Sequence, residues 1–360
     1  LLAVEASLKA FGLIPETMDL RRYLPELLSS QVAGFYDPEQ KYLALVRPAG
    51  GGKAREQMKL AEDMILVHEL THALQDQSFD LRKFQDSDPL SDAGTARTAL
   101  VEGDATLVMI DYSAGGNIES LPGMDSIMAG LLSDPDKLLA MAPDLPGGKE
   151  MADAPAWIRD NLLFGYLQGA AFCVNTRRRG GQPLLDHAFK SDPPRSTEQI
   201  LHPEKWHTRR DDPVEIQLPD LSAELPGYRR VAEGVMGEMT VRTLLREGLK
   251  DGDRAATAAG GWGGDRFAVY EKAGAGRLVA WVTDWDTEAD AAELRQALEP
   301  MGGGWEAVPA GPSRVVVLRG ASGLDAARRE ALLGRLAAAT ARRPENREID
   351  LPALGIKPAG

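Results

Sequence analysis

Cysteine, histidine and long apolar runs are all scarce in this chain of 360 residues. The one cysteine, Cys173, excludes an internal disulfide framework and a metal site built only from cysteines. The chain has no run of 18 apolar residues, so we expect no membrane span. Only five histidines occur, and two of them, His68 and His72, stand four residues apart.

Positive charge is also in deficit. The chain has 41 lysine and arginine residues against 54 aspartate and glutamate residues, which gives a net charge of −13. So acidic a chain repels phosphate backbones, and general nucleic-acid binding is excluded on that ground. A hydrophobic fraction of 43% and a charged fraction of 26% are typical of a folded globular protein. The length favours two domains over one hydrophobic core.

The sequence constrains the compartment only weakly. The chain starts at Leu1, which is compatible with a removed leader peptide. A single cysteine suits the cytosol as well as many exported bacterial proteins. Between the two we favour an exported bacterial protein, and the sequence indicates no oligomeric state.

Helical patterns dominate the first part of the sequence. We expect long helices over residues 55–77, 92–112 and 156–179, with a separate short helix around 184–189 and a strand over Lys41–Val46. A polar, proline-containing stretch from Arg209 to Pro226 is typical of a domain boundary. These patterns predict a mainly helical domain over residues 1–215.

The pattern changes after that boundary. A hairpin is expected from Arg266–Glu271 and Arg277–Thr283, followed by a helix over Glu288–Leu298. The same hairpin–helix order recurs within residues 305–342. Two such units predict a small antiparallel sheet with helices on one face. We therefore expect an α+β fold overall, with a small α+β domain over residues 216–345 and an extended tail over residues 346–360.

The segment His68-Glu69-Leu70-Thr71-His72 carries the clearest chemistry. Residues four apart on a helix lie on one face, so the two imidazoles can each offer a nitrogen to one zinc ion. Glu69 projects about 100° away from His68, where it reaches a water held by the metal rather than the metal itself. That is the arrangement of a general base beside a metal ion. The helix is otherwise apolar here, and buried imidazoles need partners such as a metal.

Zinc bound by two histidines needs a third protein ligand. Glu102 is the best candidate, because its neighbours on the helix are small and Gly103 costs ~1 kcal/mol against alanine in a helix. We expect this thin helix face to approach the His68–His72 helix closely. Asp76 is expected to support a ligand from behind, and Asp104 points away from Glu102. The full set of candidates is Asp76, Glu102, Asp104, His187, His202 and His207.

These residues resemble a known family. The run from His68 to Asp76, followed on a second helix by Glu102-Gly103-Asp104-Ala105, is similar to the gluzincin metallopeptidases of the thermolysin-like clan. The stretch Tyr166-Leu167-Gln168-Gly169 with Phe172 resembles a later helix of small members of that clan. The resemblance extends over about residues 34–206.

The resemblance implies a zincin-like catalytic domain with a short edge sheet. It implies that zinc is bound by His68, His72 and Glu102 and that Glu69 is the base. It also implies that the strand over Lys41–Val46 is the edge that pairs with an extended substrate. Many members carry an aspartate four residues after the ligand glutamate, whereas this chain has Thr106.

A zinc peptidase commonly has a histidine, tyrosine or arginine that stabilises the developing oxyanion. His202, in a loop before Pro203, is the first candidate and Tyr166 is the second. His187 and His207 are expected at the surface.

The function that the sequence predicts is that of a zinc-dependent metallopeptidase acting on a peptide or protein substrate. The cofactor would be zinc, and Glu69 would take a proton from the attacking water. Two alternatives stay open: a metallohydrolase of a non-peptide amide, and a metal-stabilised binding scaffold without activity. An intact Glu69 favours an enzyme, because a purely structural site does not need a base.

Overall fold

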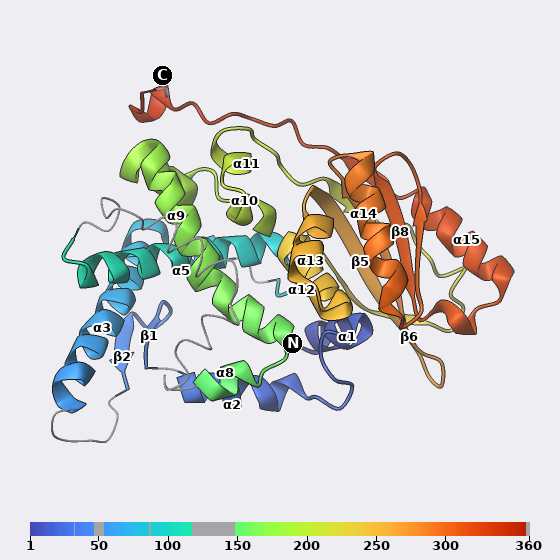
Figure 1. The fold of residues 1–360 in the computed structure, drawn as a ribbon, viewed down its shortest axis with the longest axis horizontal. Helices are drawn as coiled ribbons and strands as arrows, with labels where there is room; N and C mark the ends of the chain where they lie inside the picture. The colour runs from blue at the N-terminus through green and yellow to red at the C-terminus, as the bar shows by residue number, and fades with distance from the viewer. Residues whose placement is uncertain (32, 47–53, 86–87, 117–147, 358–360) are drawn as a thin grey trace.

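The computed structural model describes residues 1–31, 33–46, 54–85, 88–116 and 148–357. The expected α+β class is confirmed, since a helical N-terminal part is followed by a five-stranded antiparallel sheet toward the C terminus (Figure 1). The sequence between the helices expected over 92–112 and 156–179 lies mostly outside the described residues. Within the described ranges, no helix is long and apolar enough to span a membrane.

Three long helices build the N-terminal part: α3 (Ala54–Phe79), α5 (Asp92–Ser113) and α9 (Ala156–Lys190). The Ser91 side chain accepts a hydrogen bond from the Gly94 N–H and so caps the start of α5. A hairpin of β1 (Gly34–Asp37) and β2 (Tyr42–Leu45) packs beside α3. The shorter helices are α1 (Leu2–Phe11), α2 (Leu20–Gln31), α4 (Leu81–Phe84), α8 (Gly148–Ala152), α10 (Thr197–Leu201) and α11 (Glu204–His207).

Helix α9 joins two segments that the sequence predicted as separate helices. It runs through both the 156–179 and the 184–189 segments, with a kink at Gly181 (φ 66°, ψ −167°). Pro183 lies two residues after the kink, and its ring cannot be accommodated by an uninterrupted helix. The predicted break between the two helices is therefore a bend within α9. Residues from both sides of the bend pack in the same hydrophobic cluster.

Helices α5 and α9 cross backbone to backbone. A Cβ on Gly103 would lie 2.0 Å from the carbonyl carbon of Gly169, and a Cβ on Gly169 would lie 1.9 Å from the Ala99 oxygen. Glycine is required at both positions because any side chain would collide with the other helix. The sequence led us to expect that Gly103 allows α5 to approach α3, and the helix named in that expectation is wrong. Gly103 faces α9.

The C-terminal sheet has the strand order β4-β5-β6-β8-β7 and is antiparallel throughout. The long hairpin of β5 and β6 forms its centre, and a capping box of Thr287 and Asp290 begins α14, the helix expected over Glu288–Leu298. The strands are β4 (Arg229–Gly234), β5 (Trp262–Lys272), β6 (Gly276–Trp285), β7 (Trp305–Pro309) and β8 (Arg314–Arg319). The helices are α12 (Gly237–Leu249), α13 (Gly252–Ala259), α14 (Glu288–Leu298) and α15 (Ala326–Ala337).

Both faces of this sheet are covered, which corrects the expectation of helices on one face only. Phe267, Trp281 and Val317 point into a core with α1, α12, α13 and α14. Their strand neighbours, such as Ala268 and Val316, point the other way into a core that includes α15. Strands that are buried on both faces have continuous apolar sequences instead of alternating ones. The sequence pattern therefore did not show whether helices cover one face of the sheet or both.

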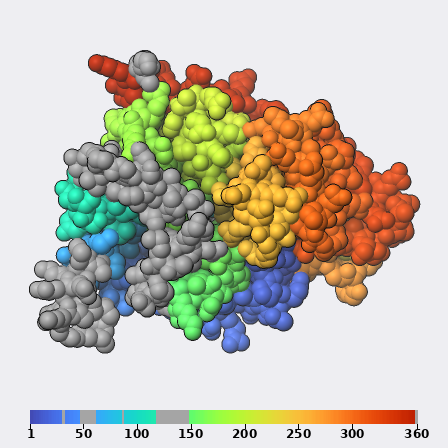
Figure 2. Space-filling model, in the orientation of Figure 1, coloured from blue at the N-terminus to red at the C-terminus, as the bar shows by residue number. Residues whose placement is uncertain are grey.

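The two ends of the chain cross the predicted division at residue 215. Helix α1 lies against the sheet, with Phe11 packed edge-on to Phe267 and Trp281. In Figure 2 the blue N-terminal residues abut the yellow and orange C-terminal part. Beyond residue 345 the tail returns to the helical part, where Leu351 is buried in the same cluster as α5 and α9 residues (Figure 1). A short strand pair, β3 (Glu215–Gln217) with β9 (Thr340–Arg342), precedes it.

Candidate metal centre

The three side chains predicted as zinc ligands, those of His68, His72 and Glu102, converge between α3 and α5. The Nε2 atoms of His68 and His72 are 3.1 Å apart, and the Oε2 atom of Glu102 lies 3.3 Å from the first and 3.4 Å from the second. A tetrahedral zinc ion with bonds of ~2.0–2.1 Å separates neighbouring donor atoms by about 3.3–3.4 Å. The three donors therefore have the spacing of three corners of a zinc tetrahedron.

Hydrogen bonds behind His72 set its protonation. Gln75 donates through Nε2 to the Val101 carbonyl at 3.1 Å and to Asp104 Oδ2 at 2.8 Å. This orientation turns the Gln75 oxygen toward His72 Nδ1, 2.9 Å away, so Nδ1 carries the proton. The lone pair of His72 then lies on Nε2, which is the atom that faces Glu102 and His68.

That arrangement calls for a positive charge between the three donors. A lone pair on Nε2 repels the Glu102 carboxylate unless a proton or a metal ion lies between them. Burial alone would raise the pKa of Glu102, but the two imidazoles, when protonated at Nε2, outweigh burial through their hydrogen bonds and hold the pKa at about 2. The same carboxylate raises the pKa of His72 against the effect of burial. The site thus favours a negative Glu102 with a cation beside it.

Glu69 lies on α3 between the two histidines and is not one of the three converging donors. Its side chain is buried, with 7% exposure, and burial raises its pKa although the neighbouring imidazoles oppose this. The backbone of Tyr36 on β1 lies near this carboxyl group and lowers its pKa, against the larger effect of burial. A carboxyl group with a raised pKa, close to a metal site, has the properties of a general base.

The strand of the β1–β2 hairpin that approaches Glu69 includes Tyr36, on β1. Its partner β2 lies within the strand expected over Lys41–Val46. The sequence analysis did not include β1, because a strand of four residues gives too short a pattern to identify without its partner.

Asp76 does not contact either histidine, which corrects its expected role. Its Oδ2 atom accepts hydrogen bonds from the Tyr36 hydroxyl at 2.7 Å and from Lys41 Nζ at 2.5 Å, and Oδ1 accepts from the Leu81 N–H at 3.2 Å. Asp76 therefore ties the β1–β2 hairpin to α3. It positions the strand that contacts Glu69.

The polar atoms behind His68 also differ from those behind His72. The Nδ1 atom of His68 and the Oγ1 atom of Thr106 are both buried and have no hydrogen-bond partner among the described residues. Thr106 stands where many gluzincins carry an aspartate. Among the described residues, His68 Nδ1 therefore has no supporting hydrogen bond, whereas His72 Nδ1 is supported by Gln75.

Of the two oxyanion candidates, Tyr166 lies near the site and His202 has another partner. The Tyr166 ring on α9 is 5.9 Å from the His68 ring, centroid to centroid. Tyr166 is 42% exposed, but the part of it that faces the site is desolvated, and this, followed by the charges of Glu102 and Glu69, raises its pKa, so its hydroxyl keeps its proton. His202 Nε2 pairs with Glu238 Oε1 of α12 at 3.0 Å. That pairing favours the second candidate over the first.

The other nominated histidines lie elsewhere. His187 is half-buried on α9 and His207 is half-buried at the end of α11, so neither is fully at the surface. His207 Nδ1 is 2.7 Å from the Thr208 hydroxyl. Neither belongs to the group formed by His68, His72 and Glu102.

Two residues that matter here were not singled out in the sequence. Gln75 stands three residues after His72, on the same helix face, and that spacing could have identified it. Tyr36 had no such indication, because only the packing of β1 against α3 brings it to Glu69.

A second group of three carboxylates, Glu198, Asp211 and Asp286, also brings ligand atoms within 4.8 Å of one another. Lys205 occupies its centre. The Lys205 ammonium lies 2.6 Å from Glu198, 2.6 Å from Asp286 and 3.3 Å from Asp211. A lysine already supplies the cation in this cluster.

Comparisons with known proteins concern only the C-terminal part. A sequence family described as a domain of unknown function, DUF8575, matches residues 224–340. The match covers the five-stranded sheet and its helices, and it includes none of His68, Glu69, His72 and Glu102. Neither the curated proteins nor the solved structures contain a match to this chain.

Proposed function

We propose that this protein is a zinc-dependent metallopeptidase, with His68, His72 and Glu102 as the zinc ligands. The observation that carries the proposal is the set of donor distances, 3.1, 3.3 and 3.4 Å, which fits one tetrahedral zinc ion. The orientation of Gln75 supports it, because it leaves the His72 lone pair directed at the shared centre.

The residues around this centre divide the chemistry between them. When bound, zinc supplies positive charge beside a substrate carbonyl and makes a water more acidic. Glu69 takes the proton of the attacking water and passes it to the leaving amine, a role that its raised pKa favours. Tyr166, which keeps its proton, donates a hydrogen bond to the oxygen that becomes negative.

An extended peptide is the substrate that suits the neighbouring strand. Among the described residues the sheet formed by β1 and β2 has two strands, so one edge of β1 is not paired with β2. A peptide can add to such an edge through main-chain hydrogen bonds. Because Asp76 fixes this hairpin on α3 through Tyr36 and Lys41, the added peptide would lie beside Glu69.

The test is Glu69→Gln, assayed for zinc content, melting temperature and cleavage of a peptide library. This change keeps the size of the side chain but removes the carboxylate that accepts a proton. Zinc and fold should stay, while cleavage should fall by the ~10²–10⁴-fold typical of losing a positioned base. Glu62→Gln, the same change two turns earlier on α3, should leave cleavage unchanged.

Other results would change the assignment. Clearly measurable cleavage that is unchanged in Glu69→Gln would refute the mechanism. Loss of zinc in Glu69→Gln would make Glu69 a ligand. Zinc-loaded wild-type protein that cleaves no peptide would leave the metal-stabilised scaffold as the better interpretation.

A further inference from the structure

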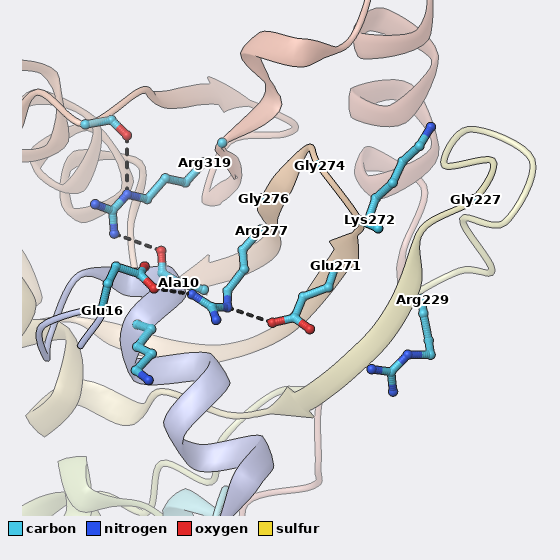
Figure 3. A pocket seen from close by; sticks show the side chains of 14 residues that line it. Ala10, Glu16, Gly227, Arg229, Glu271, Lys272, Gly274, Gly276, Arg277 and Arg319 are labelled. Carbon is cyan, nitrogen blue, oxygen red and sulfur yellow. Dashed lines mark hydrogen bonds and ion pairs between the residues drawn. The ribbon is translucent and has the colours of Figure 1, made fainter. Parts of the chain in front are cut away.

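An open cavity of about 830 Å³ lies at one end of the C-terminal sheet (Figure 3). Its walls come from the end of α1, the start of β4, the β5–β6 turn and the end of β8. Helix α3, which carries the histidines, lies toward the opposite end of the long axis of the molecule (Figure 1). The cavity shares no lining residue with the metal centre.

Basic side chains outnumber acidic ones in this cavity. Five basic residues line it, and the acidic residues are Glu16 and Glu271 alone. Both acids hold Arg277, at 2.6 Å and 2.7 Å (Figure 3). Lys9 pairs with Glu5, outside the cavity. The other three basic residues have no carboxylate within ion-pair distance in the described part of the chain; they are Arg229, Lys272 and Arg319.

Two of these three cations are held in place by uncharged groups. Arg319 donates to the Ala10 carbonyl at 2.8 Å and lies over the Trp305 ring, 4.8 Å from its centroid. Lys272 donates to the Pro226 carbonyl at 3.2 Å and lies over the Tyr228 ring, 5.4 Å from its centroid. Carbonyls and rings fix the position of a cation without cancelling its charge. The charge therefore stays available to a ligand, and little side-chain entropy is lost on binding.

Arg229 is the freest of the three. It stands opposite Glu271 in the β4–β5 ladder, but the Glu271 carboxylate is bonded to Arg277. Figure 3 draws no interaction between Arg229 and that pair. The adjacent turn contributes Gly274 and Gly276, and no atom lies within 4 Å of where their Cβ atoms would be. Small residues thus leave the entrance beside Arg229 uncovered.

We propose that this cavity binds a small polyanion that carries at least two phosphate groups. A volume of about 830 Å³ falls in the range of small-molecule sites and exceeds what a single anion fills. The guanidinium groups suit phosphate oxygens, which they bind through paired N–H donors. A concentration of uncompensated cations is also unexpected in a chain with a net charge of −13, unless a ligand uses it. The site is independent of the proposed peptidase centre.

The test is isothermal titration of the full chain with inorganic pyrophosphate at low and high salt. Wild type should bind, and its affinity should fall as salt is raised because the contacts are ionic. Arg229→Ala should weaken binding at least about tenfold, and Arg229→Ala combined with Lys272→Ala should weaken it further. Arg230→Ala is the matched control, since Arg230 follows on the same strand, pairs with Glu233 and does not line the cavity.

Three results would overturn the proposal. The first is no detectable binding of pyrophosphate by wild type at millimolar concentration. The second is equal binding by the Arg229→Ala, Lys272→Ala double variant and by Arg230→Ala. The third is binding that survives in that double variant but is lost in Glu102→Gln, which would assign pyrophosphate to the metal centre. A poly-glutamate peptide that binds where pyrophosphate does not would make the partner an acidic protein instead.

Discussion

Two groups of carboxylates in this molecule, one around the buried Glu198 and one around the half-buried Glu102, acquire their counter-charge in different ways. Between α10, α11 and the sheet, Glu198 and two aspartates surround the ammonium of Lys205. Glu198 and Asp286 raise the pKa of Lys205 although burial opposes its charge, and burial raises the pKa of Glu198 although Lys205 opposes this. Between α3 and α5, Glu102 faces two imidazole nitrogens, and the described residues place no lysine or arginine within ion-pair distance of it.

This difference distinguishes a candidate metal site, between α3 and α5, from an ion-pair cluster, around Lys205. Both groups pass the same distance test, with three donor atoms within 4.8 Å. Only the α3–α5 group lacks a resident cation, and it alone includes imidazoles, which zinc prefers over an all-carboxylate set. A protein compensates the charges that it buries. The informative feature is therefore that no lysine or arginine of the described residues lies within ion-pair distance of Glu102.

The largest effect is expected on zinc binding. Glu102→Gln removes the only carboxylate of the α3–α5 group and should lower zinc affinity by more than about 100-fold, because ligands outweigh their supporting groups. Asp211→Asn makes the equivalent change in the Lys205 cluster and should leave zinc content unchanged. Metal analysis of both purified variants checks this. Equal zinc content in Glu102→Gln and Asp211→Asn would contradict the assignment of the zinc site to the α3–α5 group.

The next effect concerns the lysine itself. Lys205→Met leaves the buried Glu198 carboxylate without its cation and should lower the free energy of unfolding by about 3 kcal/mol. Lys83→Met, which breaks the exposed pair of Lys83 with Asp80, should change it by less than about 1 kcal/mol. Chemical denaturation measures both. A wild-type-like Lys205→Met would mean that the cluster is not held by its lysine.

Asp92 extends the comparison to a carboxyl group that has neither lysine nor metal. It is fully buried, accepts a hydrogen bond from the Thr197 N–H, and lies near the charges of Asp265 and Glu238. Burial first, and then those charges, raise its pKa from 3.8 to about 7, so its counter-charge is a proton.

The folded state then binds more protons than the unfolded state between pH 4 and 7. The stability contributed by Asp92 is complete below pH 4 and declines as pH rises through 7, by up to about 4 kcal/mol. Asp92→Asn does not titrate, so its stability relative to wild type should increase over that window. Unfolding at several pH values measures this. A difference that stays constant with pH would contradict a protonated Asp92.

The smallest effect is expected from the residue behind the ligands. Gln75→Leu removes the acceptor that fixes the proton on His72 Nδ1 and should weaken zinc binding about 10–100-fold. Gln77→Leu, an exposed position on the same helix, should leave zinc affinity unchanged. Competition with a zinc chelator measures the affinities. If both variants match wild type, the Gln75 hydrogen bond does not orient the ligand.

Much of the fold followed from local pattern. The helices α3, α5 and α14 and the β5–β6 hairpin form close to where periodicity and capping residues predicted them. Elements with one buried face or a clear cap are specified within a few residues of sequence. The short strand β1 and the covering of both sheet faces were missed, because each depends on a partner distant in the chain.

The candidate site divides in the same way. The sequence by itself determined that His68 and His72 share a face of a helix and that Glu69 does not, because the 3.6-residue repeat is a local property. The sequence also limited the third zinc ligand to six candidate residues. Only the packing of α3 against α5 brings Glu102 to 3.3 Å and 3.4 Å from the two histidines.

Other roles were decided by tertiary structure alone. Asp76 and Asp104 are both acidic residues near the motif, yet one ties β1 to α3 and the other holds Gln75. Lys205 makes an ion-pair cluster out of three carboxylates separated by up to 88 residues. Spacing along a helix fixes neighbours within one or two turns. The counter-charge of a buried group comes from whichever segment packs against it, and that choice is made only when the whole chain has folded.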